Sequence, residues 1–207
     1  MLPSPYTENV EMSKILVARS ADLGFIKVVG RGSFQNSSCL KAFYQQLLKE
    51  GVRRFVVDLE ACTYLDSTFL GILLGLGLKL REAGNGLLHI LNANPRNLEL
   101  LRNLGLDRLI NIDGAASSDP NGGNGFGGGA NARGTGNGLG ARPVKLNGVK
   151  EEHLQEMPCP VPTRAEAAPT ILEAHENLME FDPRNVPKFK DVVEFLREDL
   201  GQATAKN

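Results

Sequence analysis

Apolar positions recur with two different spacings near the start of the chain, and each spacing predicts one type of element. Two short apolar runs, residues 15–18 and 25–29, are separated by a polar turn that contains glycine, and together they predict a β-hairpin. In the following stretch, "SFQNSSCLKAFYQQLLKEG", apolar residues stand three and four positions apart. That spacing predicts a helix that begins near Asn36 or Ser37 and ends at Gly51.

The next sixty residues continue the alternation of strand and helix patterns. Residues 53–59 predict a buried strand, residues 67–84 a helix, residues 87–91 a strand, and residues 108–112 a last short strand. Another helix, with Pro95 in its first turn, lies between the last two strands. The order ββαβαβαβ predicts an α/β domain whose later strands are joined by helices and are therefore largely parallel.

Composition changes abruptly after residue 112. Eleven of the 23 glycines lie between residues 114 and 140, with almost no apolar residues among them, and prolines interrupt the stretch that follows up to residue 169. Such a segment is too poor in apolar residues to offset its ordering entropy, so it predicts a flexible linker. Helical spacing then returns in residues 170–181 and 187–200, which predict two short amphipathic helices hinged at Asp182 and Pro183.

These patterns divide the chain into four predicted segments. They are an N-terminal extension (1–13), an α/β domain (14–112), a linker rich in glycine and proline (113–169) and a C-terminal helical segment (170–201).

Charge and composition exclude several classes of function. The 207 residues carry a formal net charge of −1 with Lys and Arg scattered, which argues against a nucleic-acid partner. Cys39, Cys62 and Cys159 lack a C-x-x-C pairing, so they are read as reduced thiols of a cytoplasmic protein. The longest apolar stretch, residues 69–78, is too short to span a bilayer.

No catalytic or metal-binding pattern is legible in the sequence. The histidines and cysteines show neither metal-ligand spacing nor a nucleophile, base and orienter arrangement, so we expect no enzyme activity, no metal and no cofactor. The stretch "GNGFGG" matches G-x-G-x-x-G, but no predicted strand precedes it and no predicted helix follows it. We therefore expect no dinucleotide site there.

The most informative short stretch is "TYLDSTFLG", which stands between a predicted buried strand and a predicted buried helix. Asp66 or Ser67 is a natural N-cap, because its side-chain oxygen can accept a hydrogen bond from a free backbone N–H of the first turn. Capping alone would explain both residues, and that interpretation stands beside a functional one.

A longer run, "RRFVVDLEACTYLDSTFLGILLGLGLKLREAGNGLLHILNANPRNLELLRNLGLDRLINI", resembles the STAS domain of bacterial anti-sigma factor antagonists. The resemblance covers about residues 14–112 and implies a mixed sheet with helices mainly on one face. It also implies that Ser67 is phosphorylated by a partner that is both anti-sigma factor and kinase, and that Asp66 supports the loop. Thr68 and Asp58 match the family pattern, whereas Phe69 stands where the family commonly has glycine.

The resemblance supports two hypotheses about function. The first is a non-catalytic regulatory binding module, controlled by phosphorylation of Ser67, that binds an anti-sigma factor/serine kinase-like protein through Asp58 and residues 66–69. In that reading a bulky Phe69 fills the groove in which the kinase docks. The alternative is a STAS scaffold that assembles a larger signalling or envelope-associated complex through its C-terminal helices, without a phospho-switch.

The two C-terminal helices need a surface to cover their apolar stripes, because isolated helices of this length are marginal in water. A sheet with helices on one face leaves the other face open, so we expect the tail to dock there through Phe189, Val193 and Leu196. The alternative is that the tail folds only on a partner. Gly71 and Gly75, spaced as G-x-x-x-G, indicate close packing of their helix on the sheet.

Overall fold

The structure, a computed structural model, describes residues 13–113 and 151–204, and a mixed β-sheet lies at its centre. The strands of this sheet are β1 (Lys14–Arg19), β2 (Leu23–Gly32), β3 (Arg54–Asp58), β4 (Cys62–Leu65), β5 (Leu87–Leu91), β6 (Asn111–Ile112) and β7 (Gln155–Glu156). They lie in the order β6-β5-β3-β2-β1-β7, and β4 pairs with the end of β2. Strand β1 is antiparallel to β2 and β7, whereas β2, β3, β5 and β6 are mutually parallel.

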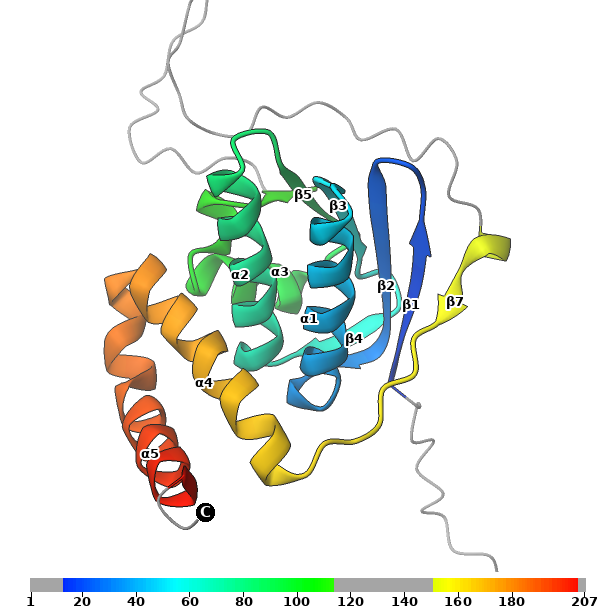
Figure 1. Cartoon of the computed structure of the whole chain (residues 1–207). Helices are drawn as coiled ribbons and strands as arrows, with labels where there is room; N and C mark the ends of the chain where they lie inside the picture. Colours follow the sequence, from blue (N-terminus) through cyan, green and yellow to red (C-terminus); the bar gives the residue numbers. More distant parts are fainter. Residues whose placement is uncertain (1–12, 114–150, 205–207) are drawn as a thin grey trace, which may run out of the picture.

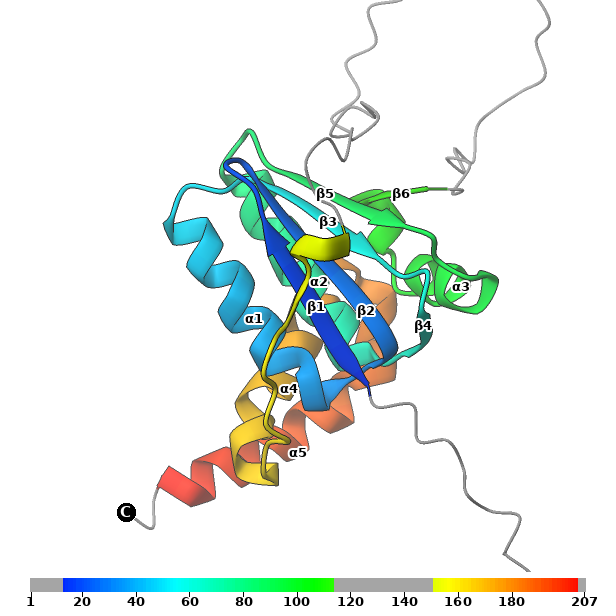
Figure 2. The ribbon, with the colours of Figure 1, turned by 90° about the vertical axis from the view of Figure 1, so that its right-hand side faces the viewer.

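Helices cover one face of this sheet in two layers (Figure 1). The α-helices are α1 (Phe34–Lys49), α2 (Ser67–Glu82), α3 (Pro95–Asn103), α4 (Arg164–Phe181) and α5 (Val186–Thr204), and the 3₁₀ helices are η1 (Leu106–Arg108), η2 (Glu151–His153) and η3 (Pro183–Asn185). Helices α1 and α2 lie against the sheet, α4 crosses outside them, and α5 packs on α4 (Figures 1 and 2). The predicted mixed α/β sheet with helices mainly on one face, followed by C-terminal helices, is confirmed.

Helix α2 is the centre of the core. Every residue from Thr68 to Gly77 is buried, so the helix is enclosed around its whole circumference. A helix that is apolar on all sides has to be covered on all sides. Core side chains of the sheet cover the inner side of α2, and α4 covers its outer side.

The segment before α4 differs from its prediction as a linker. Residues 114–150, where the glycine-rich part of that linker was predicted, lie outside the described residues, as does most of the predicted N-terminal extension. Residues 151–169 are not a linker, because they contain β7, which pairs with β1, and the first turns of α4. Thr163 caps α4 in a capping box with Glu166, and Pro169 lies inside the helix. The pattern T-x-x-E at residues 163–166 predicts the start of a helix, but the nearby prolines led to the prediction of a linker.

The structure also differs from the sequence-based prediction at α1 and at β4. Helix α1 begins after Ser33, whose backbone N–H donates to Asn36 Oδ1 at 2.9 Å, and not at Asn36 or Ser37. Strand β4 lies in a region expected to be a loop. It has only four residues and pairs with β2 across a register shift, so its alternation was too short to recognise.

We expected the C-terminal tail, α4 and α5, to dock on the open face of the sheet. It docks instead on the helical layer. A Cβ atom at Gly71 would lie 2.2 Å from the carbonyl oxygen of Ala174 in α4, and one at Gly75 would lie 2.7 Å from Asn177 Nδ2. The two glycines therefore admit a second helix and do not mark close packing on the sheet. The open face buries only a small cluster of Ala18, Leu23, Phe25 and Val56.

Candidate functional site

The junction of β4 and α2 is held by Asp66, whose carboxylate caps two helices at once. Oδ1 accepts a hydrogen bond from the backbone N–H of Phe69 at 2.8 Å, and Oδ2 accepts one from the backbone N–H of Phe34 at 2.9 Å. The first bond closes the start of α2 and the second closes the start of α1. Asp66 is therefore the N-cap, and it fixes the position of Ser67 as the first residue of α2.

The Ser67 hydroxyl contacts the tail. Its Oγ lies 2.9 Å from Nε2 of His175 in α4, and Nδ1 of His175 lies 2.8 Å from the backbone oxygen of Ile171. Burial lowers the pKa of His175, although its bond to Ile171 and the nearby Asp66 oppose this shift, so the ring is neutral at neutral pH. A carbonyl oxygen can only accept, so Nδ1 carries the proton. We assign Ser67 as the donor to Nε2.

The Ser67–His175 pair lies close to a half-buried carboxylate and to an aromatic ring. Burial raises the pKa of Asp66, even though the amides of Phe69 and Phe34 donate to it. The ring of Phe189, in α5, packs on His175 with 4.8 Å between the ring centroids. The pair is therefore enclosed on the tail side by apolar surface.

A groove of about 520 Å³ opens beside Ser67. Its walls come from the β4–α2 junction, α3 and the start of α5, and they include Tyr64, Leu65, Arg96, Leu100, Lys188 and Phe189. The guanidinium of Arg96 stacks on the ring of Tyr64, 5.3 Å from its centroid. The groove therefore combines apolar walls with cationic groups, next to a half-exposed serine.

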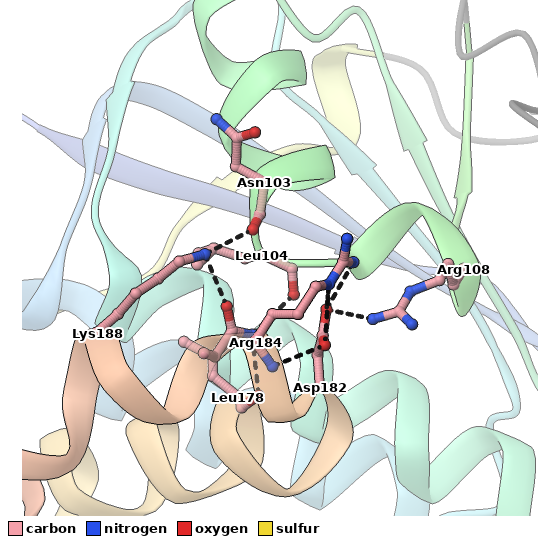
Figure 3. A network of polar contacts seen from close by, with 8 residues as sticks. Asn103, Leu104, Arg108, Leu178, Asp182, Arg184 and Lys188 are labelled. Atoms are coloured by element: carbon pink, nitrogen blue, oxygen red, sulfur yellow. Dashed lines mark hydrogen bonds and ion pairs between the residues drawn. The ribbon is translucent and has the colours of Figure 1, made fainter.

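A polar network fastens the tail to the domain at the hinge between α4 and α5 (Figure 3). Nδ2 of the buried Asn185 donates to the backbone oxygens of Leu104, in the domain, and Leu178, in α4, both at 3.0 Å. The buried Asp182 carboxylate pairs with Arg108 of η1 and with Nη2 of Arg184, the latter at 2.8 Å.

Lys188 adds a further bond to this network, from Nζ to the Asn103 oxygen at 2.9 Å. Hydrogen bonds from Arg184 hold the pKa of Asp182 below its usual value, so the carboxylate stays charged at neutral pH. We call Asp182, Asn185 and Lys188, with their partners, the hinge latch.

The structure separates the residues expected to bind a partner. Asp66 and Ser67 are half-buried and border the groove, whereas Thr68 is buried and Phe69 is fully buried. Phe69 lies against the backbone of Gly32, where an added Cβ would meet its ring at 3.0 Å. Phe69 therefore belongs to the core and cannot fill a surface groove, because its position on α2 points it toward β2.

Asp58 also has a structural role. Its Oδ1 accepts hydrogen bonds from the backbone N–H of Glu60 at 3.0 Å and from Asn92 Nδ2 at 2.9 Å, and the residue is 7% exposed. These bonds join the turn after β3 to the turn after β5. Asp58 is therefore not part of the surface around Ser67.

The three expected tail anchors all face inward, although against the helical layer. Val193 and Leu196 are buried, and Phe189 packs on His175 at the edge of the groove. His175 and Asn185 were not recognised as site residues. A lone histidine at helical spacing and a single asparagine between two helices carry no signal without knowledge of where α4 docks.

The described part of the chain holds no group of three or more His, Cys, Asp or Glu side chains arranged to bind a metal ion. Among the same residues, every helix is too short or too polar to cross a bilayer.

Comparisons with known proteins find similarity to a family over part of this chain. The family model described as "Mlab, STAS domain" matches residues 15–111. A search of curated proteins finds no match.

Several solved structures are also similar. They include an anti-sigma factor antagonist from Mycobacterium paratuberculosis (21% identity, 54% of this chain and 89% of that one, TM-score 0.43). A putative anti-sigma factor antagonist from Thermotoga maritima has 18% identity over 46% of this chain and 82% of that one, with a TM-score of 0.43. The Bacillus cell fate determinant SpoIIAA in its phosphorylated form has 19% identity over 47% of this chain and 89% of that one, with a TM-score of 0.41. At such identities and TM-scores these similarities support no inference about function.

Proposed function

Because a STAS-domain family model matches residues 15–111, we propose that this chain is a non-catalytic regulatory module that binds a partner protein in the cytoplasm. Its partner is an anti-sigma factor/serine kinase-like protein, and phosphorylation of Ser67 switches the binding. In this proposal no cofactor takes part, and recognition is centred on the surface around Asp66 and Ser67.

The double cap made by Asp66 is the observation that carries this proposal. One carboxylate holds the N-termini of α1 and α2 together and presents Ser67 at the start of α2, beside an apolar groove with cationic groups. A serine held in this way has a defined position, and its surroundings offer both the contact area and the charges that a protein partner requires.

The effect of a phosphate on Ser67 follows from its neighbours. It would add about −1.5 to −2 charges beside the carboxylate of Asp66. The phosphoester oxygen has no proton to donate, so the hydrogen bond to Nε2 of His175 would be lost. A contact surface formed around the unmodified serine would therefore be disrupted locally, without unfolding of the sheet.

A binding experiment with three forms of the full-length chain tests the switch. Wild type, Ser67→Ala and Ser67→Asp are used as baits in extracts of the native cell, and the captured proteins are quantified by mass spectrometry. We expect wild type and Ser67→Ala to capture the same kinase-like protein, and Ser67→Asp to capture at least tenfold less, equivalent to about 1.4 kcal/mol of binding free energy.

Ser38→Asp is the matched control. Ser38 also contacts the tail, through Thr170 Oγ1 at 3.1 Å, but it lies within α1 and does not border the groove. A carboxylate there disturbs the tail without placing charge at the start of α2. Equal capture by wild type and Ser67→Asp, or equal loss with Ser38→Asp, would contradict a switch at Ser67.

A scaffold function remains the second candidate, and exposed apolar residues of the tail favour it. Phe195 is 55% exposed and Val192 is 41% exposed, both on α5. A second, largely apolar groove of about 400 Å³ lies between Phe34 and the N-terminal half of α4. If the scaffold function is correct, Phe195→Ser will remove the captured proteins whereas Ser67→Asp will not.

A further inference from the structure

The face of α1 and α2 beneath α4 is polar at its rim, unlike the interior of the domain. Three side-chain pairs join it to α4, and they are Ser67 with His175, Ser38 with Thr170, and Lys41 with Glu173. Between them, Gly71 and Gly75 let the backbone of α4 approach α2 closely, and Asn177 donates to the Gly71 oxygen at 3.3 Å. Surface polar pairs around a close backbone contact are typical of an interface between separate proteins.

Three observations indicate that α4 can leave this face. The buried hydroxyl of Tyr44 has no hydrogen-bond partner among the described residues, and it lies near Gly75 and Glu173, where α4 excludes water from it. Pro169 lies inside α4 and removes one of the helix's own hydrogen bonds. Helix α4 also lies outside residues 15–111, so the STAS domain ends before the element that covers its face.

Several buried polar contacts of the tail are clustered at one end. Asn185 and Asp182 bind the domain at the α4–α5 hinge through Leu104 and Arg108. Helix α4 is therefore held at its C-terminal end by the hinge latch and by the buried Leu178, and along the rest of its length by small residues such as Ala167 and Ala174 and by the three polar pairs. Loss of the latch would release the helix without removing any residue of the face beneath it.

We infer that the face of α1 and α2 beneath α4 is an interaction surface that α4 keeps closed, and that the partner opens it by replacing α4 with an amphipathic helix of its own. An emptied face would leave the outer side of α2 exposed, so a replacement has to be a helix with an apolar face.

The contacts of α4 specify the chemistry of that helix. A small residue, as at Ala174, fits against Gly71. An acidic residue one position earlier, as at Glu173, pairs with Lys41. A hydrogen-bond acceptor one position later, as at His175, receives the Ser67 hydroxyl.

This inference rests on the proposed function for the identity of the partner, and it explains how Ser67 is controlled. While α4 is docked, the Ser67 hydroxyl donates to His175, and α4 covers the side of Ser67 that faces it. Modification of Ser67 therefore opposes docking of α4, and docked α4 in turn covers the hydroxyl that a kinase has to reach.

A binding experiment with a synthetic peptide tests the surface directly. The probe is a fluorescent peptide of residues 163–204, which carries α4 and α5, and it is titrated with full-length wild type, Asn185→Ala and Lys190→Ala. Lys190 is exposed on α5 and lies outside the latch, so it is the matched control. We expect Asn185→Ala to bind the peptide at least tenfold more tightly than the other two, because apparent affinity scales with the open fraction.

Hydrogen exchange of the wild type is the second measurement, and it needs no variant. The amides of α4 are expected to exchange at least tenfold faster than those of β3, since α4 opens before the sheet unfolds. Equal protection of α4 and β3, or equally weak peptide binding by all three forms, would overturn the inference while leaving a phospho-switch at Ser67 possible. Tight binding to Asn185→Ala, with no phosphate on Ser67 in cells, would instead retain the surface and refute the proposed switch.

Discussion

Replacing Gly71 with alanine separates the stability of the domain from the docking of the tail. Within α2 alone the change is favourable, because alanine exceeds glycine in helix propensity by about 1 kcal/mol. With α4 docked, the new Cβ would lie 2.2, 2.6 and 2.8 Å from the oxygen, carbonyl carbon and Cα of Ala174. These are backbone atoms, so no side-chain rotation relieves the overlap, and α4 has to move by roughly 1 Å to reach ordinary contact distance.

The expected magnitude follows from what that movement breaks. Overpacking of a tight contact costs about 1–3 kcal/mol. The same shift weakens the bonds from Ser67 to His175 and from Asn177 to Gly71, each worth about 0.5–1.5 kcal/mol. The gain in helix propensity is the same whether α4 is docked or not, so it does not enter this sum. With about 1 kcal/mol for the two weakened bonds, we expect a loss of about 2–4 kcal/mol in the free energy of α4 docking.

Hydrogen exchange by mass spectrometry measures this loss as faster exchange of the α4 amides, with β3 unchanged. Gly201→Ala is the matched control, because it makes the same change in α5 at a position where the new Cβ would meet no atom within 4 Å beyond its chain neighbours and its own helix backbone. The control should leave α4 protection as in the wild type. Unchanged α4 protection in Gly71→Ala would refute the close contact between α2 and α4.

Three further predictions concern single side chains. Phe69→Ala is expected to lower the free energy of urea unfolding by about 3–5 kcal/mol, because the ring is fully buried; a loss below about 1 kcal/mol would mean that Phe69 is not a core residue. Asp66→Ala should cost more than Thr163→Ala in the same assay, since Asp66 caps two helices and Thr163 caps only α4; equal losses would contradict the double cap. Docking of α4 buries His175 and lowers its pKa. The stability that the neutral ring contributes is therefore complete above about pH 6.5, the pKa of the ring in the unfolded chain, and is lost as the pH falls from there toward the lower pKa of the docked ring. Midpoints of thermal unfolding between pH 7.5 and 5.5 should therefore fall more in wild type than in His175→Gln, and parallel curves would exclude His175 as the cause.

The α/β domain was predictable because its signals are local. The runs that became β3 and β5 and the helical spacing of α2 each carry their own pattern, and the order of elements implies parallel strands. The capping role at the β4–α2 junction was also legible, since Asp66 and Ser67 precede a buried helix. Which of them caps depends on backbone geometry, and the structure assigns the cap to Asp66.

The location of the tail could not be derived in the same way, because it depends on contacts between residues about a hundred positions apart. The sequence did contain one signal. Helix α2 is apolar around its whole circumference, so another element has to cover its outer side. Gly71 and Gly75 lack side chains there and leave room for a second helix to approach closely. His175 and Asn185 acquire their roles only after α4 is placed there, so no pattern within α4 could identify them.

Phosphate on Ser67 is the central claim of this account, and one measurement addresses it most directly. The full-length chain is purified from its own cells, digested and analysed by mass spectrometry for the peptide that contains Ser67, with the peptide that contains Ser38 as an internal control. The account predicts phosphate on Ser67, none on Ser38, and loss of the partner from the phosphorylated fraction. Recovery of the Ser67 peptide only in unmodified form, from both the partner-bound and the partner-free fractions, would contradict it.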